Sequence, residues 1–431
     1  MPLLRFRYGA HLSKEQVAEL VRPHPDTLEL VSSWLVHHGV RSSSISTTHG
    51  GAWLTVTDVL VSQANQLLGA SYQLYRHANT NDTIIRTVGY ALPAVLHTHI
   101  QAVAPTTYFA PSRMLRQTPR RRSFGVTAAQ AQAASGKLAT VLSSRDSEVD
   151  PSYLRFMYNT FAYTPVATDK NTLGIMGFLD EYPSRADLTK FMTDFNSDTK
   201  DATFTVEQVN GGGNDPRNPG QEANADVQYA SAMAYPTPLI FYSTGGDAKW
   251  SDSGEPMPGD MYLEWFNYLL KQPKIPQTIS ISYSSHERDL PPAYATALCK
   301  LFGQLGARGV SVLFSSGDKG VGPENCKDDS GNVRFIPEFP PTCTCGVLSP
   351  LASTTQAQVQ VAHQIALISQ VPTSLASVAQ QAIQRKRRTF PEAASRSTFH
   401  ARATRTARCP NSSSTKVASM LASTSPLAAP T

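Results

Sequence analysis

Residues 221–227 read Gln-Glu-Ala-Asn-Ala-Asp-Val, with Glu222 and Asp226 four positions apart. Four residues make about one helical turn, so a helix here would project both carboxylates from one face. Neighbours such as Ala223 and Val227 are small or apolar, which indicates a helix that packs against other elements. Two carboxyl groups this close share a proton, because the charge of one raises the pKa of the other. A solvated helix face is the alternative interpretation of the same spacing.

Short apolar segments alternate with helical runs on both sides of this stretch. We expect strands over residues 173–179, 204–209, 238–243, 278–283 and 310–314, and helices over residues 188–195, 222–233, 258–270 and 291–305. This alternation predicts an α/β fold with a doubly wound parallel sheet between layers of helices. In such sheets, functional residues gather at the carboxyl ends of the strands.

A second candidate site follows the last of these strands. Residues 310–322 read Val-Ser-Val-Leu-Phe-Ser-Ser-Gly-Asp-Lys-Gly-Val-Gly, which places Asp318 just beyond the carboxyl end of the strand. A plain turn is the alternative, since Gly and Asp both favour turns.

The acidic helix and the Ser316-Gly317-Asp318 turn together resemble the sedolisins, the serine-carboxyl peptidases that include the tripeptidyl-peptidases. The resemblance implies a subtilisin-like sheet and cleavage of peptide bonds through an acyl-enzyme at acidic pH. It implies that Glu222 is the general base, that Asp226 polarises it and that Asp318 donates to the oxyanion. The family's nucleophilic Ser lies in a Gly-Thr-Ser-Ala-Ser segment that these 431 residues do not contain. We therefore expect the chain as written, whose sheet would be truncated, to be inactive.

Residues 1–110 are predicted to form a separate α+β domain. Helical spacing covers residues 13–19 and 25–38, and alternating strands cover residues 53–57, 71–76 and 84–88. The motifs His11–Glu15, Tyr75–His77 and Pro105–Phe109 resemble those of the sedolisin prosegment, which implies that this domain inhibits the peptidase part of its own chain. Its histidines are either pH sensors or ordinary surface residues: His11, His24, His37, His38, His77, His97 and His99.

Residues 111–150 form the expected linker, and residues 151–343 the N-terminal part of the peptidase domain. The linker's basic run, Arg116–Arg122, is suited to processing, although a solvated connector explains it equally well. Asn81 begins a glycosylation sequon, Asn-Asp-Thr.

The family resemblance also implies a disulfide, a metal ion and a compartment. It pairs Cys326 with Cys343. Cys299 lies in the predicted helix before the last strand, and we expect it to be a buried thiol. The family binds Ca²⁺ near its C-terminus, but we expect those ligands to be absent from this chain, and no metal is assigned to the residues present. Secretion is implied by the family, although no signal peptide opens the sequence and no apolar run is long enough to span a membrane. The expected partners are a peptide or protein substrate and the chain's own prosegment, with no nucleic acid and no membrane.

Residues 344–431 differ in composition from the rest of the chain. They hold nine Lys and Arg against one acid, so the tail alone accounts for the net charge of +5 and the basic pI. One interpretation is a disordered tail. The other is out-of-frame translation after about Cys343. If the reading frame is moved so that each codon's last base joins the next codon's first two, the codons of Ser397–His400 can encode Tyr-Phe-Pro, as in the sedolisins.

Two functions of other classes remain open. One is a non-catalytic inhibitor or folding helper built from the prosegment. The other is a structural or nucleic-acid-binding protein that uses the basic tail.

Overall fold

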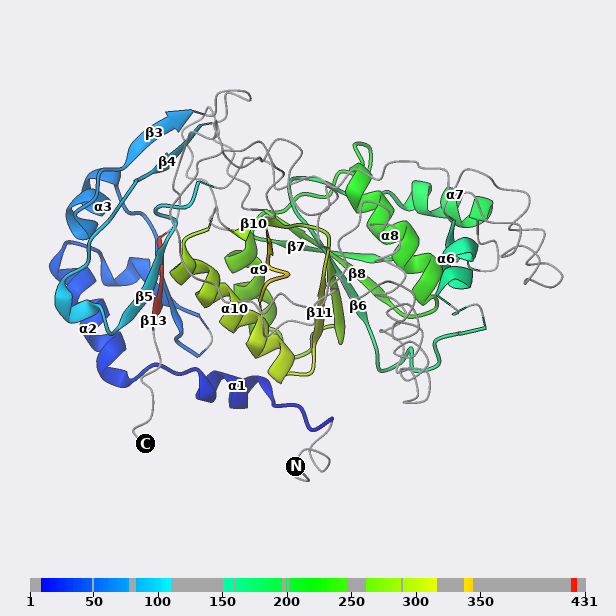
Figure 1. Cartoon of the computed structure of the whole chain (residues 1–431), viewed down its shortest axis with the longest axis horizontal. Helices are drawn as coiled ribbons and strands as arrows, with labels where there is room; N and C mark the ends of the chain where they lie inside the picture. The colour runs from blue at the N-terminus through cyan, green and yellow to red at the C-terminus, as the bar shows by residue number, and fades with distance from the viewer. Residues whose placement is uncertain are drawn as a thin grey trace, which may run out of the picture.

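The computed structural model describes residues 9–48, 50–76, 83–109, 150–158, 160, 162–195, 199, 201–245, 261–287, 290–315, 337–343 and 420–424. Within them, two bodies meet side by side: an N-terminal α+β domain and an α/β domain (Figure 1). No helix of the described residues is both long and apolar enough to cross a membrane.

A five-stranded parallel sheet is the centre of the α/β domain. Its strand order is β11-β9-β6-β8-β7. The strands are β6 (Leu173–Gly177), β7 (Thr205–Val209), β8 (Leu239–Thr244), β9 (Thr278–Ile281) and β11 (Ser311–Phe314). The helices are α6 (Pro151–Met157), α7 (Arg185–Phe195), α8 (Gln221–Ala234), α9 (Met261–Lys271) and α10 (Pro292–Ala307). A two-stranded antiparallel pair, β10 (Ser285–His286) and β12 (Glu338–Phe339), accompanies the sheet. The predicted doubly wound α/β fold is confirmed.

Helices cover both faces of the sheet, because neighbouring residues of each strand point to opposite sides. Ile175 and Phe241 pack in one cluster with residues of α6, α7 and α8. The adjacent residues Met176 and Tyr242 pack in the other cluster, with α9 and α10. Burial on both faces explains why these strands are apolar throughout rather than alternating.

The order in which the chain adds strands to the sheet reverses between β6 and β9, which are neighbours in the sheet. The connection through α7 leads from β6 toward the β7 edge, whereas the connection through α10 leads from β9 toward the β11 edge. The two connections therefore separate at the carboxyl ends of β6 and β9. Open parallel sheets place their functional sites in the crevice formed at such a point.

The N-terminal domain is an antiparallel sheet with helices. Its elements are α1 (Lys14–Leu20), α2 (Pro25–His37), β1 (Ile45–Thr47), β2 (Trp53–Val56), α3 (Val61–Leu68), β3 (Gln73–Arg76), β4 (Thr83–Arg86) and β5 (Ile100–Ala104), with 3₁₀ turns at Ser42–Ser44 and Ala94–Leu96. Helix α1 begins with a capping box: the Ser13 side chain accepts from the Gln16 backbone N–H, and the Gln16 side chain accepts from the Ser13 backbone N–H.

Part of the C-terminal tail joins this sheet. Strand β13 (Met420–Thr424) lies between β2 and β5 and is antiparallel to both, which gives the order β1-β2-β13-β5. These five residues are the described part of the tail, and they form a strand where the composition alone predicts disorder. The frame-slip hypothesis stays a prediction.

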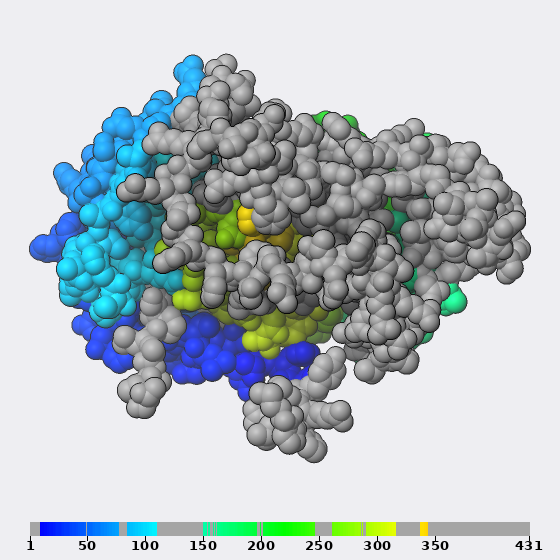
Figure 2. Space-filling view, in the orientation of Figure 1, coloured from blue at the N-terminus to red at the C-terminus, as the bar shows by residue number. Residues whose placement is uncertain are grey.

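The N-terminal domain packs against α9 and α10, as the adjacent blue and yellow-green surfaces in Figure 2 show. The backbone N–H of Leu12 donates to the Ala307 carbonyl at 2.9 Å, and the Lys14 ammonium donates to the Lys271 carbonyl at 2.7 Å. Both acceptors are at the C-terminal ends of helices, where carbonyl groups lack partners within the helix and carry partial negative charge. Trp53 of β2 extends the contact into the apolar cluster under α10.

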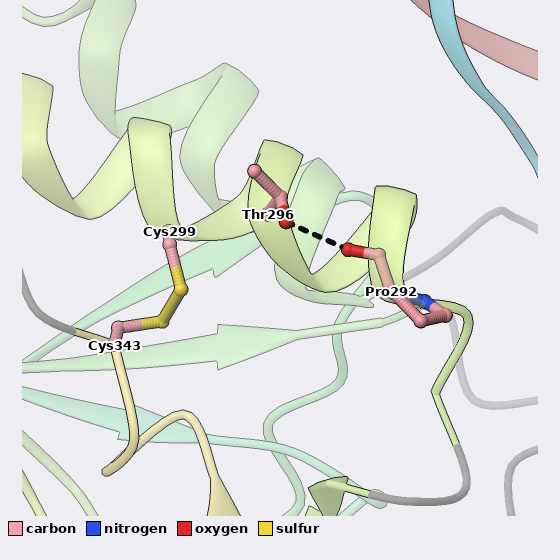
Figure 3. Close-up of a disulfide and its surroundings, with 4 residues drawn as sticks. All are labelled: Pro292, Thr296, Cys299 and Cys343. Carbon is pink, nitrogen blue, oxygen red and sulfur yellow. Dashed lines mark hydrogen bonds between the residues drawn. A yellow bond between two sulfur atoms is a disulfide. The ribbon is translucent and has the colours of Figure 1, made fainter. Parts of the chain in front are cut away.

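The disulfide differs from the one that the family resemblance implies. Cys343 is bonded to Cys299 of α10, with the two Cα atoms 5.3 Å apart (Figure 3). Cys343 is buried in the same cluster as the helix, which brings it to Cys299 across 44 residues of sequence. The predicted Cys326–Cys343 pairing and the free Cys299 thiol are therefore wrong. Cys326 itself lies outside the described residues.

Candidate active site

Glu222 and Asp226 are both in the first half of α8, one turn apart. Glu222 is 8% exposed and Asp226 is 7% exposed. Burial of both side chains rules out the solvated helix face, because unpaired carboxylates are rarely buried without a function or a proton to share.

Asp226 is held by a residue from the sheet. The Ser282 hydroxyl, just beyond the end of β9, donates to Oδ1 of Asp226 at 2.8 Å. Burial raises the pKa of the Asp226 carboxyl from 3.8 to about 7; the Ser282 hydrogen bond opposes the rise, and the negative charge of Glu181 adds to it. Below neutral pH, Asp226 therefore holds a proton.

Glu181 is a third buried carboxylate at this place, and our sequence analysis missed it. Its Oε2 accepts from the backbone N–H of Glu222 at 2.8 Å and from that of Ala223 at 3.3 Å. The signal that could have found it is its position, since Glu181 follows the β6 segment at the carboxyl end of the sheet, as Asp318 follows β11 in the sequence.

A buried tyrosine completes the described surroundings of the carboxylates. The hydroxyl of Tyr283 donates to the Phe178 carbonyl at 3.3 Å. Burial, together with the charges of Glu181, Glu222 and Asp226, raises the pKa of Tyr283 well above its ordinary value. Tyr283 is therefore a neutral donor beside the carboxylates at every physiological pH.

Two of the three predicted catalytic residues lie within the described chain. Asp318 and the predicted glycosylation site Asn81 lie outside it. The last described residue before Asp318 is Ser315, whose backbone N–H donates to the Ile281 carbonyl at 3.1 Å. Ser315 therefore lies beside Ile281, the last residue of β9, which directly precedes Ser282.

The described residues hold no group of three or more His, Cys, Asp or Glu side chains arranged to bind a metal. The three buried carboxylates do not make one, because Glu181 faces backbone N–H groups and Asp226 retains a proton. The Ca²⁺ site that the family resemblance implies lies near the C-terminus, and the expectation that its ligands are absent stays a prediction.

Comparison with known proteins bears on the family of the chain. Residues 5–109 match the family model of the pro-kumamolisin activation domain. The chain is 34% identical over 352 residues to tripeptidyl-peptidase SED2 of Arthroderma otae, and 33% identical over 358 residues to the probable tripeptidyl-peptidase SED2 of Trichophyton verrucosum. Each alignment covers 79% of this chain and 57% of the relative, so the chain spans little more than half the length of these relatives.

A solved structure is also similar in part. Pseudomonas sedolisin, a serine-carboxyl proteinase complexed with two molecules of pseudo-iodotyrostatin, aligns with a TM-score of 0.34 at 20% identity, over 46% of this chain and 52% of that one. A score this low adds nothing to the fold, which rests on the sheet order and the two helix layers. The activation-domain match and the two tripeptidyl-peptidase relatives identify the chain as a member of the sedolisin family.

Proposed function

We propose that this chain is part of an acid serine-type peptidase that cleaves peptide bonds through an acyl-enzyme. In this proposal, Glu222 and Asp226 supply the acid and base chemistry. The observation that carries the proposal is the buried pair on α8, in which Asp226 is held by Ser282 at 2.8 Å. Acid–base catalysis needs two titratable groups whose environments separate their protonation, and burial of Asp226 holds the proton on that member of the pair.

The protonation of Asp226 decides which of the two carboxyl groups acts as the base. With its pKa raised to about 7, Asp226 keeps its proton in acid and leaves Glu222 to act as the base. Glu222 would remove the proton from a serine hydroxyl as it attacks the substrate carbonyl. Asp318, protonated at low pH, would donate to the oxyanion of the tetrahedral intermediate.

The nucleophile is the missing part of this mechanism. No Gly-Thr-Ser segment occurs in the chain, and we propose that the 431 residues as written do not hydrolyse peptides. The choice between a tripeptidyl-peptidase and an endopeptidase depends on the wall of the substrate cleft, and the named relatives favour the first. No step is assigned to Ca²⁺. The Cys299–Cys343 disulfide supports a secreted or other oxidising location.

The test has two arms. The chain as written is incubated with a fluorogenic tripeptide substrate from about pH 3 to about pH 7, and no turnover is expected. The coding DNA is then resequenced across Cys343, and a chain in the corrected frame is assayed in the same way. Turnover should appear, and it should fall by roughly 100-fold or more in Glu222→Ala and in Asp318→Ala. Full activity of the Glu222→Ala variant would overturn the proposal.

A second candidate, an inhibitor or folding helper, is favoured by the contacts between the N-terminal domain and α10. The Lys300 ammonium donates to the Gln101 side chain at 2.6 Å, and the rings of Tyr108 and Tyr294 stack with centroids 5.7 Å apart. Such a surface suits the recognition of another sedolisin peptidase. Inhibition of an active relative by the full chain, weakened by Tyr108→Ala, would support the inhibitor, and the absence of inhibition would exclude it.

A further inference from the structure

The start of α8 has no cap of its own. Its N-cap residue is Gly220, which has no side chain to accept from the first backbone N–H groups of the helix. The carboxylate of Glu181 takes that place from another part of the chain, because its Oε2 accepts from the N–H groups of Glu222 and Ala223. The positive end of the helix dipole favours a negative charge on Glu181.

Gly220 makes this contact possible. A Cβ atom at position 220 would meet the Glu181 side chain, including its Cβ and Oε2 atoms. The backbone of Gly220 is in the extended region, with φ −81°, so its torsion angles are open to any residue. Space for Glu181 is thus the reason that glycine stands here.

The chain before Glu181 is bent to direct it toward α8. Leu179 and Asp180 both have positive φ angles, 60° and 55°, which non-glycine residues seldom adopt. The N–H of Glu181 also donates to the Phe178 carbonyl at 3.3 Å, closing a turn at the end of β6. Strained backbone of this kind persists where the surroundings hold it, and it gathers at functional sites.

We propose that Glu181 is a positioning residue of the acid–base pair: it fixes the first turn of α8, and its negative charge keeps the shared proton on Asp226. This inference deepens the proposed function and rests on it. Glu181 does not touch the reacting atoms in this scheme. It acts through the backbone that carries Glu222 and through its charge.

The electrostatic part depends on the groups that face Asp226. Ser282 and Tyr283, from the end of β9, are neutral. Glu222 on the same helix and Glu181 from the end of β6 are the acidic groups. Burial raises the pKa of Asp226 most, and the charge of Glu181 adds to that rise.

The test follows the protonation of Asp226 in the full chain by infrared spectroscopy, which separates the C=O band of a protonated carboxyl from carboxylate bands. The Asp226 band is identified by its loss in Asp226→Asn. In Glu181→Gln, the midpoint of its titration should fall by roughly one pH unit, because the repelling charge is removed while the side chain keeps its shape. The control is Glu287→Gln, an exposed acid of the same domain, which should leave the midpoint unchanged.

The alternative outcomes are distinct. If Glu181 only caps the helix, Glu181→Gln and Glu181→Ala will lower the unfolding temperature and leave the midpoint where it is, and the proposal fails. If Glu181→Gln does not fold, Gly220→Ala replaces it: this variant displaces the carboxylate without removing its charge, and an unchanged midpoint there also overturns the proposal.

A kinetic arm uses the corrected-frame enzyme. There, Glu181→Gln should move the pH profile of kcat as well as lower it. Because the infrared titration requires no turnover, an inactive corrected enzyme would refute the proposed function without touching this inference.

Discussion

Asp226 makes the free energy of unfolding depend on pH, and the sign and size of its contribution follow from the structure. Its pKa rises from 3.8 to about 7 on folding. Below about pH 4, both the folded and the unfolded chain hold the proton, and this carboxyl does not favour either state. Between these pKa values the unfolded chain releases the proton and the folded chain keeps it. The contribution of Asp226 to stability is therefore fully present below its pKa in the unfolded chain, and it is lost as the pH rises through its pKa in the folded chain.

The loss is large on the scale of protein stability. A shift of about three pKa units corresponds to about 4 kcal/mol, since one unit is about 1.4 kcal/mol. Asp226→Asn removes it, because the amide has the shape of the protonated acid and does not ionise. Relative to the wild type, the variant should become more stable by about 4 kcal/mol between pH 4 and pH 8.

The measurement is urea unfolding of both proteins at several pH values, followed by tryptophan fluorescence. Comparing variant with wild type cancels the other groups that titrate in the same range. The matched control is Asp169→Asn, an exposed acid of the same domain, whose stability difference from the wild type should stay constant. A constant difference for Asp226→Asn as well would refute the reasoning, because it would mean that Asp226 titrates alike in the folded and unfolded chain.

Three further predictions concern the fold. Cys299→Ala should lower the free energy of unfolding by about 4 kcal/mol, the chain-entropy value for a 44-residue loop closed by Cys343, and added reductant should make the wild type equal to it in urea unfolding. Gly309→Ala should lower the free energy of unfolding by at least about 1 kcal/mol in the same assay, because Gly309 has φ +86° and a Cβ atom there would meet the ring of His11. Gly89→Ala, with open space around the added methyl group, should not lower it. Removal of residues 420–431 should speed amide exchange in β2 and β5, which both pair with β13, and unchanged exchange would contradict that pairing.

Local patterns were sufficient for much of the fold. The helix predicted over residues 222–233 is α8, and the expected strands over 173–179 and 278–283 contain β6 and β9. The two strands are largely apolar because they are buried on both faces of the sheet, and burial is what the hydrophobic pattern records. The order of the strands in the sheet was not predicted, because alternation and right-handed crossovers leave more than one order open.

Contacts between distant segments were not predictable in this way. Glu181 meets α8 only because two left-handed residues precede it and because Gly220 has no side chain, and neither feature has a periodic signal. The Cys299–Cys343 bond depends on where α10 packs, whereas the family resemblance implied another partner for Cys343. Strand β13 pairs with β2 and β5 across more than 300 residues of sequence, a distance over which composition carries no information.

The fold also explains why the site is suited to acid. Three carboxylates, Glu181, Glu222 and Asp226, are buried at the carboxyl end of one sheet, where mutual repulsion would destabilise three negative charges. The arrangement is stable when one charge faces the N-terminus of a helix and another is neutralised by a proton. The helix end is supplied by α8 and serves Glu181, and the proton is on Asp226. Raising the pH removes that proton and destabilises the fold, so the conditions that favour folding of this site are also the conditions under which the proposed acid–base pair would work.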